Sequence, residues 1–161
     1  MKFSILIPAS AVLFMAVPAA AQVMTPREYV MTAGASDLYE RQSAQIVLET
    51  TANPDVKSFA TMMLSAHAKS TADVKAAAMK SKIKVSPPML MPAQMEMVAQ
   101  LKAENGPARD AAYLAQQRSA HGQALFVQQA YAMGGTAPAL KAVAAKIVPV
   151  VKMHIAMLMK M

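Results

Sequence analysis

Apolar residues recur every three to four positions along most of this 161-residue chain, and no stretch alternates apolar and polar residues as a half-buried strand does. The clearest case is a stripe near the carboxyl end, formed by Leu140, Val143, Ile147, Val151 and Leu158. Proline, glycine and asparagine divide the pattern into five predicted helices, over residues 26–52, 54–81, 93–104, 107–133 and 137–160. We therefore predict an all-α protein.

Capping signals support several of these helix starts. Thr25 precedes a proline, and Glu28 three residues later completes a capping box. Asn53 also precedes a proline and is expected to cap the second helix. Gly134-Gly135 is expected to end the fourth helix, and Thr136 to cap the fifth.

The connection lengths predict the topology. The first and second helices, and likewise the fourth and fifth, are joined by very short turns and must fold back as antiparallel pairs. Between the second and fourth helices lie more than twenty residues that contain the short third helix. Two antiparallel hairpins joined by one long crossover form the ferritin-like four-helix bundle, which is our predicted fold.

The amino-terminal residues are typical of a cleavable signal peptide. Lys2 is followed by an apolar stretch over residues 3–17, and Ala19-Ala20-Ala21 offers a cleavage site. We predict a signal peptide at residues 1–21 and a single domain at residues 22–161, exported to the bacterial periplasm. The alternative, an uncleaved anchor, is disfavoured by the shortness of the apolar stretch.

Composition excludes several classes of function. The chain has no cysteine, so it has no disulfide, thiolate metal site or cysteine nucleophile. Its net charge is +7, but the only tight basic run, Lys80, Lys82 and Lys84, has no aromatic residues around it. Nucleic-acid binding is therefore not expected. Weak attraction to anionic surfaces of the cell envelope is expected instead.

The three histidines and one glutamate are the candidate chemistry. His67, His121 and His154 each fall near the middle of a different predicted helix, and Glu40 lies mid-way along a fourth. Counted along the helices, Glu40, His67 and His121 are level, and His154 lies about 7 Å lower. The four residues could ligate one divalent ion such as zinc in the bundle core. The alternative is a metal-free hydrogen-bond network with Tyr39, Tyr113 or Asp110.

Methionine is the second unusual feature, with 16 residues in the chain. Four of them lie close together in the crossover and its helix: Met89, Met91, Met95 and Met97. Thioethers are soft ligands that select Cu(I), so this segment is a weak candidate Cu(I) site. The alternative is that these methionines fill the core or contact a partner.

An ordered set of segments resembles a known family. The segments are SDLYE at 36–40, NPDVKSFA at 53–60 with His67 following, RDAAY at 109–113 with His121 following, and LKA at 140–142 leading to Pro149 and His154. They resemble the exported bacterial proteins grouped as domain of unknown function 4142, which look ferritin-like. By this resemblance the characteristic polar positions are Glu40, His67, Asp110, His121 and His154. The family usually carries an acidic residue just before the second-helix histidine, where this chain has Ala66.

A di-iron centre of the ferritin type is not expected. Such centres need a glutamate three residues before each ligating histidine. The corresponding residues here are Leu64, Arg118 and Val151. No catalytic motif is present either, such as a nucleophile elbow, a phosphate loop or a His-Glu-x-x-His sequence. We therefore expect a non-catalytic binding or stress-related protein of the bacterial envelope, or alternatively a periplasmic metal-binding protein.

Overall fold

The computed structural model describes residues 24–161, and the predicted signal peptide at 1–21 lies outside them. The described residues form five helices and no strand, which confirms the all-α prediction. The helices are α1 (Pro26–Leu48), α2 (Pro54–Lys80), α3 (Pro92–Ala103), α4 (Gly106–Gly134) and α5 (Pro138–Leu158). Within the described part of the chain, no helix is both long enough and apolar enough to cross a membrane.

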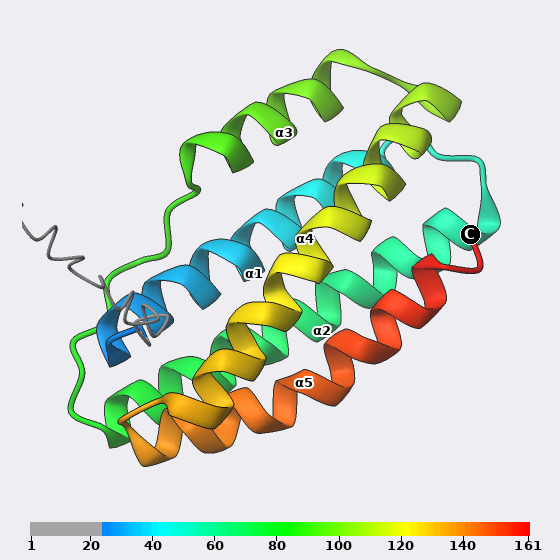
Figure 1. Cartoon of the computed structure of the whole chain (residues 1–161). Coiled ribbons are helices and arrows are strands. Elements are labelled where there is room, and N and C mark those ends of the chain that lie inside the picture. Colours follow the sequence, from blue (N-terminus) through cyan, green and yellow to red (C-terminus); the bar gives the residue numbers. More distant parts are fainter. Residues whose placement is uncertain (1–23) are drawn as a thin grey trace, which may run out of the picture.

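Four of the helices form the bundle (Figure 1). The chain reverses between α1 and α2 and again between α4 and α5, so each pair is antiparallel, and the contacts within these pairs are the most extensive. The crossover carries the chain back along the bundle, so α2 and α4 run in the same direction, as the connection lengths predicted. Helix α3 lies outside the bundle and packs on α1 and α4.

The first two helix starts have the predicted caps. The Thr25 hydroxyl accepts a hydrogen bond from the Glu28 amide at 3.3 Å, and the Glu28 carboxylate accepts one from the Thr25 amide at 2.8 Å. The Asn53 side chain accepts from the amides of Asp55 and Val56 at 2.9 and 3.3 Å. These bonds satisfy amides that have no partner within the helix.

Two predicted helix limits were wrong. Helix α1 ends at Leu48 rather than residue 52, because its last turn tightens and Thr51 turns to bond the Asn53 amide and Asp110. Helix α5 is preceded by Ala137 rather than capped by Thr136, because Pro138 takes the first helical position.

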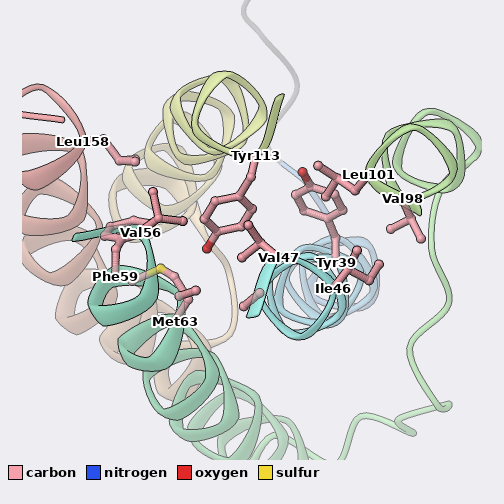
Figure 2. Packing of buried hydrophobic residues seen from close by; sticks show 12 residues of the cluster. Tyr39, Ile46, Val47, Val56, Phe59, Met63, Val98, Leu101, Tyr113 and Leu158 are labelled. Atoms are coloured by element: carbon pink, nitrogen blue, oxygen red, sulfur yellow. The ribbon is translucent and has the colours of Figure 1, made fainter. Parts of the chain in front are cut away.

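The bundle has two apolar clusters. One is built around residues such as Tyr39, Phe59, Met63, Tyr113 and Leu158 (Figure 2). The other is built from the opposite halves of the same helices and includes Tyr29, Tyr131 and Leu140. On each of the four bundle helices, buried polar residues fall between the parts that contribute to the two clusters. This polar layer contains the candidate site.

Candidate metal centre

The three histidines converge in the middle of the bundle. His67, His121 and His154 are all buried, and each offers one ring nitrogen to a group of atoms that lie within 4.8 Å of one another. Their ring centroids are separated by 5.3 to 5.9 Å, so the rings form a nearly equilateral triangle. Three of the four candidate residues thus lie together, and His154 lies beside the other two histidines despite the offset expected from counting along the helices.

A backbone carbonyl fixes the orientation of His121. Its Nδ1 lies 3.0 Å from the carbonyl oxygen of Gln117, one turn earlier on α4. A carbonyl can only accept, so Nδ1 carries the hydrogen. The Nε2 of the neutral ring is therefore a bare lone pair, and it lies 3.2 Å from Nδ1 of His154.

That lone pair in turn fixes the hydrogen of His154. Because Nε2 of His121 accepts, Nδ1 of His154 must donate across the 3.2 Å contact. The Nε2 of His154 is then also bare, and it has no hydrogen-bond partner among the described residues. The Phe59 ring packs against both imidazoles, with centroids 6.2 Å from His121 and 6.4 Å from His154.

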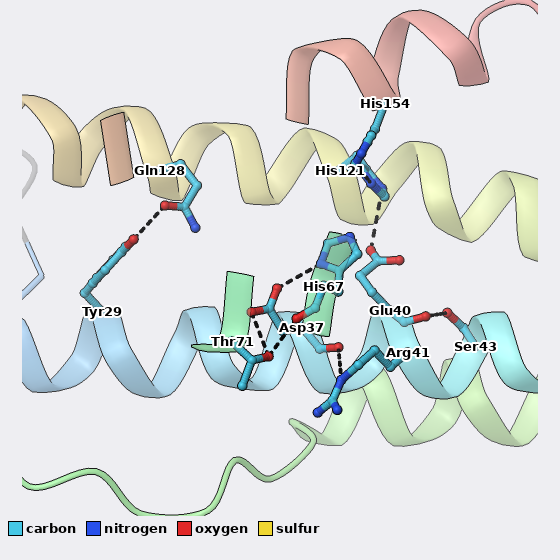
Figure 3. Close-up of polar contacts among 10 residues, drawn as sticks. All are labelled: Tyr29, Asp37, Glu40, Arg41, Ser43, His67, Thr71, His121, Gln128 and His154. Atoms are coloured by element: carbon cyan, nitrogen blue, oxygen red, sulfur yellow. Dashed lines mark hydrogen bonds and ion pairs between the residues drawn. The ribbon is translucent and has the colours of Figure 1, made fainter. Parts of the chain in front are cut away.

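A carboxylate orients His67. Nδ1 of His67 donates to Asp37 at 2.8 Å, and the other Asp37 oxygen accepts from the Thr71 hydroxyl at 3.1 Å (Figure 3). The Nε2 of His67 is buried without a partner among the described residues. A carboxylate that holds one ring nitrogen while the other stays free is the usual support of a metal-ligating histidine. Sequence reasoning missed this role of Asp37, although its place one turn before Glu40 on the same helix row signalled it.

Glu40 is buried beside His121. Its carboxylate oxygen Oε1 lies 3.5 Å from Nδ1 of His121, while Oε2 has no partner among the described residues (Figure 3). Glu40 therefore lies on the Nδ1 side of the His121 ring and is not one of the three residues whose ligand atoms converge. When ionised, its carboxylate adds negative charge beside the site.

Burial sets the protonation of the cluster. Burial, together with the charge of His67, lowers the pKa of His121 to about 3 and that of His154 to about 4, so both are neutral at pH 7. Burial also raises the pKa of Glu40 to about 7. For His67, burial would lower the pKa, but the Asp37 hydrogen bond and the charges of Glu40 and Asp37 outweigh it and raise the pKa.

The spacing of the cluster is close to that of a tetrahedral metal site. Zinc–nitrogen bonds of 2.0–2.1 Å place two ligand nitrogens about 3.4 Å apart. The 3.2 Å between His121 Nε2 and His154 Nδ1 is the length of the hydrogen bond between the two rings, which would have to break before both rings bind one ion. The full group spans up to 4.8 Å, so an ion would draw the rings inward by roughly 1 Å, which rotation of the side chains can provide.

The cluster borders a groove of about 760 Å³ between α2 and α5. His67 and His154 lie among its lining residues, as does Asp37. The groove therefore leads toward two of the three imidazoles and provides a path by which an ion could reach them.

The alternative hydrogen-bond network is not formed among the described residues. The Tyr39 hydroxyl donates to Gln116 at 2.8 Å, and Asp110 accepts from Thr51 at 2.9 Å, so neither bonds a histidine. The Tyr113 hydroxyl has no partner among the described residues. Arg118 is turned toward the end of α5, where its Nε donates to the Leu158 carbonyl at 3.3 Å.

The four crossover methionines are spread out. Met91 and Met97 line a small pocket of about 100 Å³ between α3, α1 and α4. Met89 and Met95 are exposed and lie outside that pocket. The Cu(I) site proposed from the sequence stays a prediction.

Comparison with known proteins agrees with this fold. The family described as Domain of unknown function (DUF4142) matches residues 14–161, so the chain belongs to that family. The fold resembles the crystal structure of a protein from Streptomyces coelicolor named as a candidate secreted protein, DUF305. The TM-score is 0.64 at 16% identity, and the match covers 83% of this chain and 88% of the other. No curated protein matches the chain.

Proposed function

We propose that this DUF4142 protein is an exported, non-catalytic protein that binds one divalent transition-metal ion through His67, His121 and His154. The observation that carries the proposal is the convergence of three buried imidazoles, two of which have an Nε2 atom without a partner among the described residues. When the rings are neutral, the Nε2 atoms of His67 and His154 are lone pairs that a metal ion could bind.

A metal-free core of this kind is costly. The Nε2 atoms of His67 and His154 and one oxygen of Glu40 are buried without partners among the described residues. Each such group costs about 1–3 kcal/mol. All three are acceptors when the histidines are neutral, so they cannot satisfy one another. A single cation between the rings would satisfy the two Nε2 atoms, and the negative charge of Glu40 would partly balance it.

The ligand set favours a borderline divalent ion. Neutral imidazoles suit zinc, copper(II), nickel and cobalt(II) better than the hard ions magnesium and calcium. The positions that hold the bridging glutamates of di-iron sites are Leu64, Arg118 and Val151, which supports a mononuclear site. Zinc is our first expectation.

Two observations support export. The sequence at 1–21 has the charge, apolar stretch and small residues of a signal peptide. The protein of similar fold from Streptomyces coelicolor is also named as a candidate secreted protein. We place this chain in the periplasm, where it would bind metal among other envelope components.

The test is direct metal binding by the purified, tag-free protein. Co(II) is the probe, because tetrahedral coordination by nitrogen gives it an intense visible absorption, and Zn(II) should displace it. We expect one ion per chain in the wild type and loss of binding in His67→Gln, His121→Gln and His154→Gln. Gln123→Ala, an exposed substitution on α4, is the matched control and should bind normally.

Two results would overturn the proposal. One is a wild-type protein that takes up neither Co(II) nor Zn(II) while its helical circular dichroism is intact. The other is unchanged binding by the variant in which all three histidines are replaced. Helical circular dichroism of each variant separates loss of the site from loss of the fold.

A further inference from the structure

The groove beside the histidines is longer than an ion needs. On α2 its lining runs from Ala66 to Lys80, and on α5 from Ala139 to His154. At 1.5 Å per residue each edge is about 20 Å long. Because the two helices are antiparallel, His67 and His154 meet at one end of the groove, and Lys80 and Ala139 meet at the other.

The walls of the groove are mostly small and apolar. Alanines at several positions along α2 and α5 leave space between the helices, and Val143, Ile147 and Val151 add aliphatic surface. The volume of about 760 Å³ lies within the usual range for small-molecule pockets. The groove is elongated and apolar over most of its lining, although charged residues such as Lys69, Asp73 and Lys146 also lie along it, so its shape fits a chain-like ligand.

The charges along the groove favour an anionic ligand. Of the two acids in the lining, Asp37 is bonded to His67, and Asp73 is paired with Lys69. Lys80 and Lys146 also line the groove and form no ion pair within residues 24–161. This unpaired positive charge lies away from the histidine end, so it would attract a negatively charged molecule into the groove but does not place the head of that molecule.

We propose that the groove binds a single-chain amphiphile with a carboxylate head, of the fatty-acid class. The carboxylate of the ligand coordinates the metal ion held by the three histidines. The alkyl chain lies along the alanine-rich walls in the direction of Lys80. The inference rests on the proposed metal site, because the ion supplies the charge that receives the head. Two features of the structure direct the head to this end: the buried, unpartnered Nε2 atoms of His67 and His154, which would hold the ion, and the lining of the groove by both residues.

Laurate, dodecanol and acetate form a matched set of probes for the Co(II)-loaded protein. Laurate shares its chain with dodecanol and its head with acetate. We expect laurate to bind at one molecule per chain, about tenfold or more tighter than either control, which corresponds to about 1.4 kcal/mol. We also expect laurate to change the visible absorption of Co(II), because its carboxylate enters the coordination sphere.

A substitution that fills the groove is the second arm. Ala142 is exposed on α5 and lines the groove, so Ala142→Trp should block the chain without disturbing the core. We expect about a tenfold loss of laurate affinity or more, with Co(II) affinity unchanged. Ala115→Trp, at an exposed position of α4 outside the groove, is the control.

The outcomes separate the two proposals. Absence of a Co(II) spectrum before laurate is added overturns the metal site. A Co(II)-loaded protein that does not bind laurate, or that binds it equally well after Ala142→Trp, overturns the groove inference alone. Equal affinities for laurate and dodecanol would also overturn it, because the head would then make no contact with the ion.

Discussion

Asp37 in α1 accepts a 2.8 Å hydrogen bond from Nδ1 of His67 in α2, and thirty residues of sequence separate the two. The bond ties together the two helices of the first hairpin at the level of the histidine cluster. It also determines which nitrogen of His67 faces the other two imidazoles. The position of a ligand on one helix thus depends on an acid on another.

Asp37→Asn should weaken metal binding while the three histidines are retained. The asparagine keeps the shape of the side chain but loses the charge that strengthens the Nδ1 hydrogen bond and the basicity of the ring. Loss of such an outer partner typically lowers metal affinity about 10–100-fold. The measurement is competition for Zn(II) with a chromophoric chelator. Asp73→Asn, which removes an exposed acid paired with Lys69, should leave the affinity unchanged, and equal effects of the two substitutions would contradict this role of Asp37.

Metal binding should strengthen as the pH rises through the neutral range. Protons compete with the ion for His67, whose pKa is raised, and for Glu40, whose pKa is raised to about 7, mainly by burial. His121 and His154 are neutral well below pH 6 and release no proton. Between pH 5.5 and 7 we therefore expect metal binding to release one to two protons. For each proton released, the metal affinity should rise about tenfold per pH unit. Glu40→Gln should reduce the release by up to about one proton, and an affinity independent of pH would contradict the assignment.

The sequence predicted the arrangement of helices well because turn chemistry is local. Proline after Thr25 and Asn53 marked two helix starts, and the long segment before α4 determined the crossover. The errors fell at helix ends, where neighbouring parts of the fold decide. Helix α1 stops early because Thr51 bonds Asp110, which belongs to α4, and sequence patterns do not show such a contact.

The site was predicted in part for the same reason. Helical spacing places His67 and His154 on inward faces, so their burial followed from the apolar rows around them. The orientation of each ring depends on a partner such as Asp37 or the Gln117 carbonyl, and these contacts exist only after the helices pack. The groove likewise results from the separation of α2 and α5, which no local pattern records.

Acidification should destabilise the metal-free fold through His154. Its pKa is lowered to about 4 in the folded protein by burial and by the charge of His67, against about 6.5 in the unfolded chain. As the pH falls from 7 to 5, His154 becomes protonated in the unfolded chain but stays neutral in the folded protein. This lowers the free energy of unfolding by about 2 kcal/mol. His154→Gln should remove that part of the pH dependence, as measured by urea denaturation at the two pH values. Lys152→Gln, an exposed substitution nearby, should retain it, and a His154→Gln protein as sensitive to pH as the wild type would contradict the assignment.

The same denaturation measurement tests how firmly the apolar core holds the histidines. Phe59 is 1% exposed, and its ring packs against Tyr113 as well as His121 and His154. Phe59→Ala removes a fully buried ring and should lower the free energy of unfolding by about 3–5 kcal/mol. Phe126 is 70% exposed, so Phe126→Ala makes the same chemical change at the surface and should shift the free energy of unfolding by about 0.5 kcal/mol or less.

Because the Phe59 ring also limits the movement of two imidazoles, Phe59→Ala should weaken Co(II) binding, whereas Phe126→Ala should not. If the two substitutions have equal effects on stability, the cluster around Phe59 is not the support of the site.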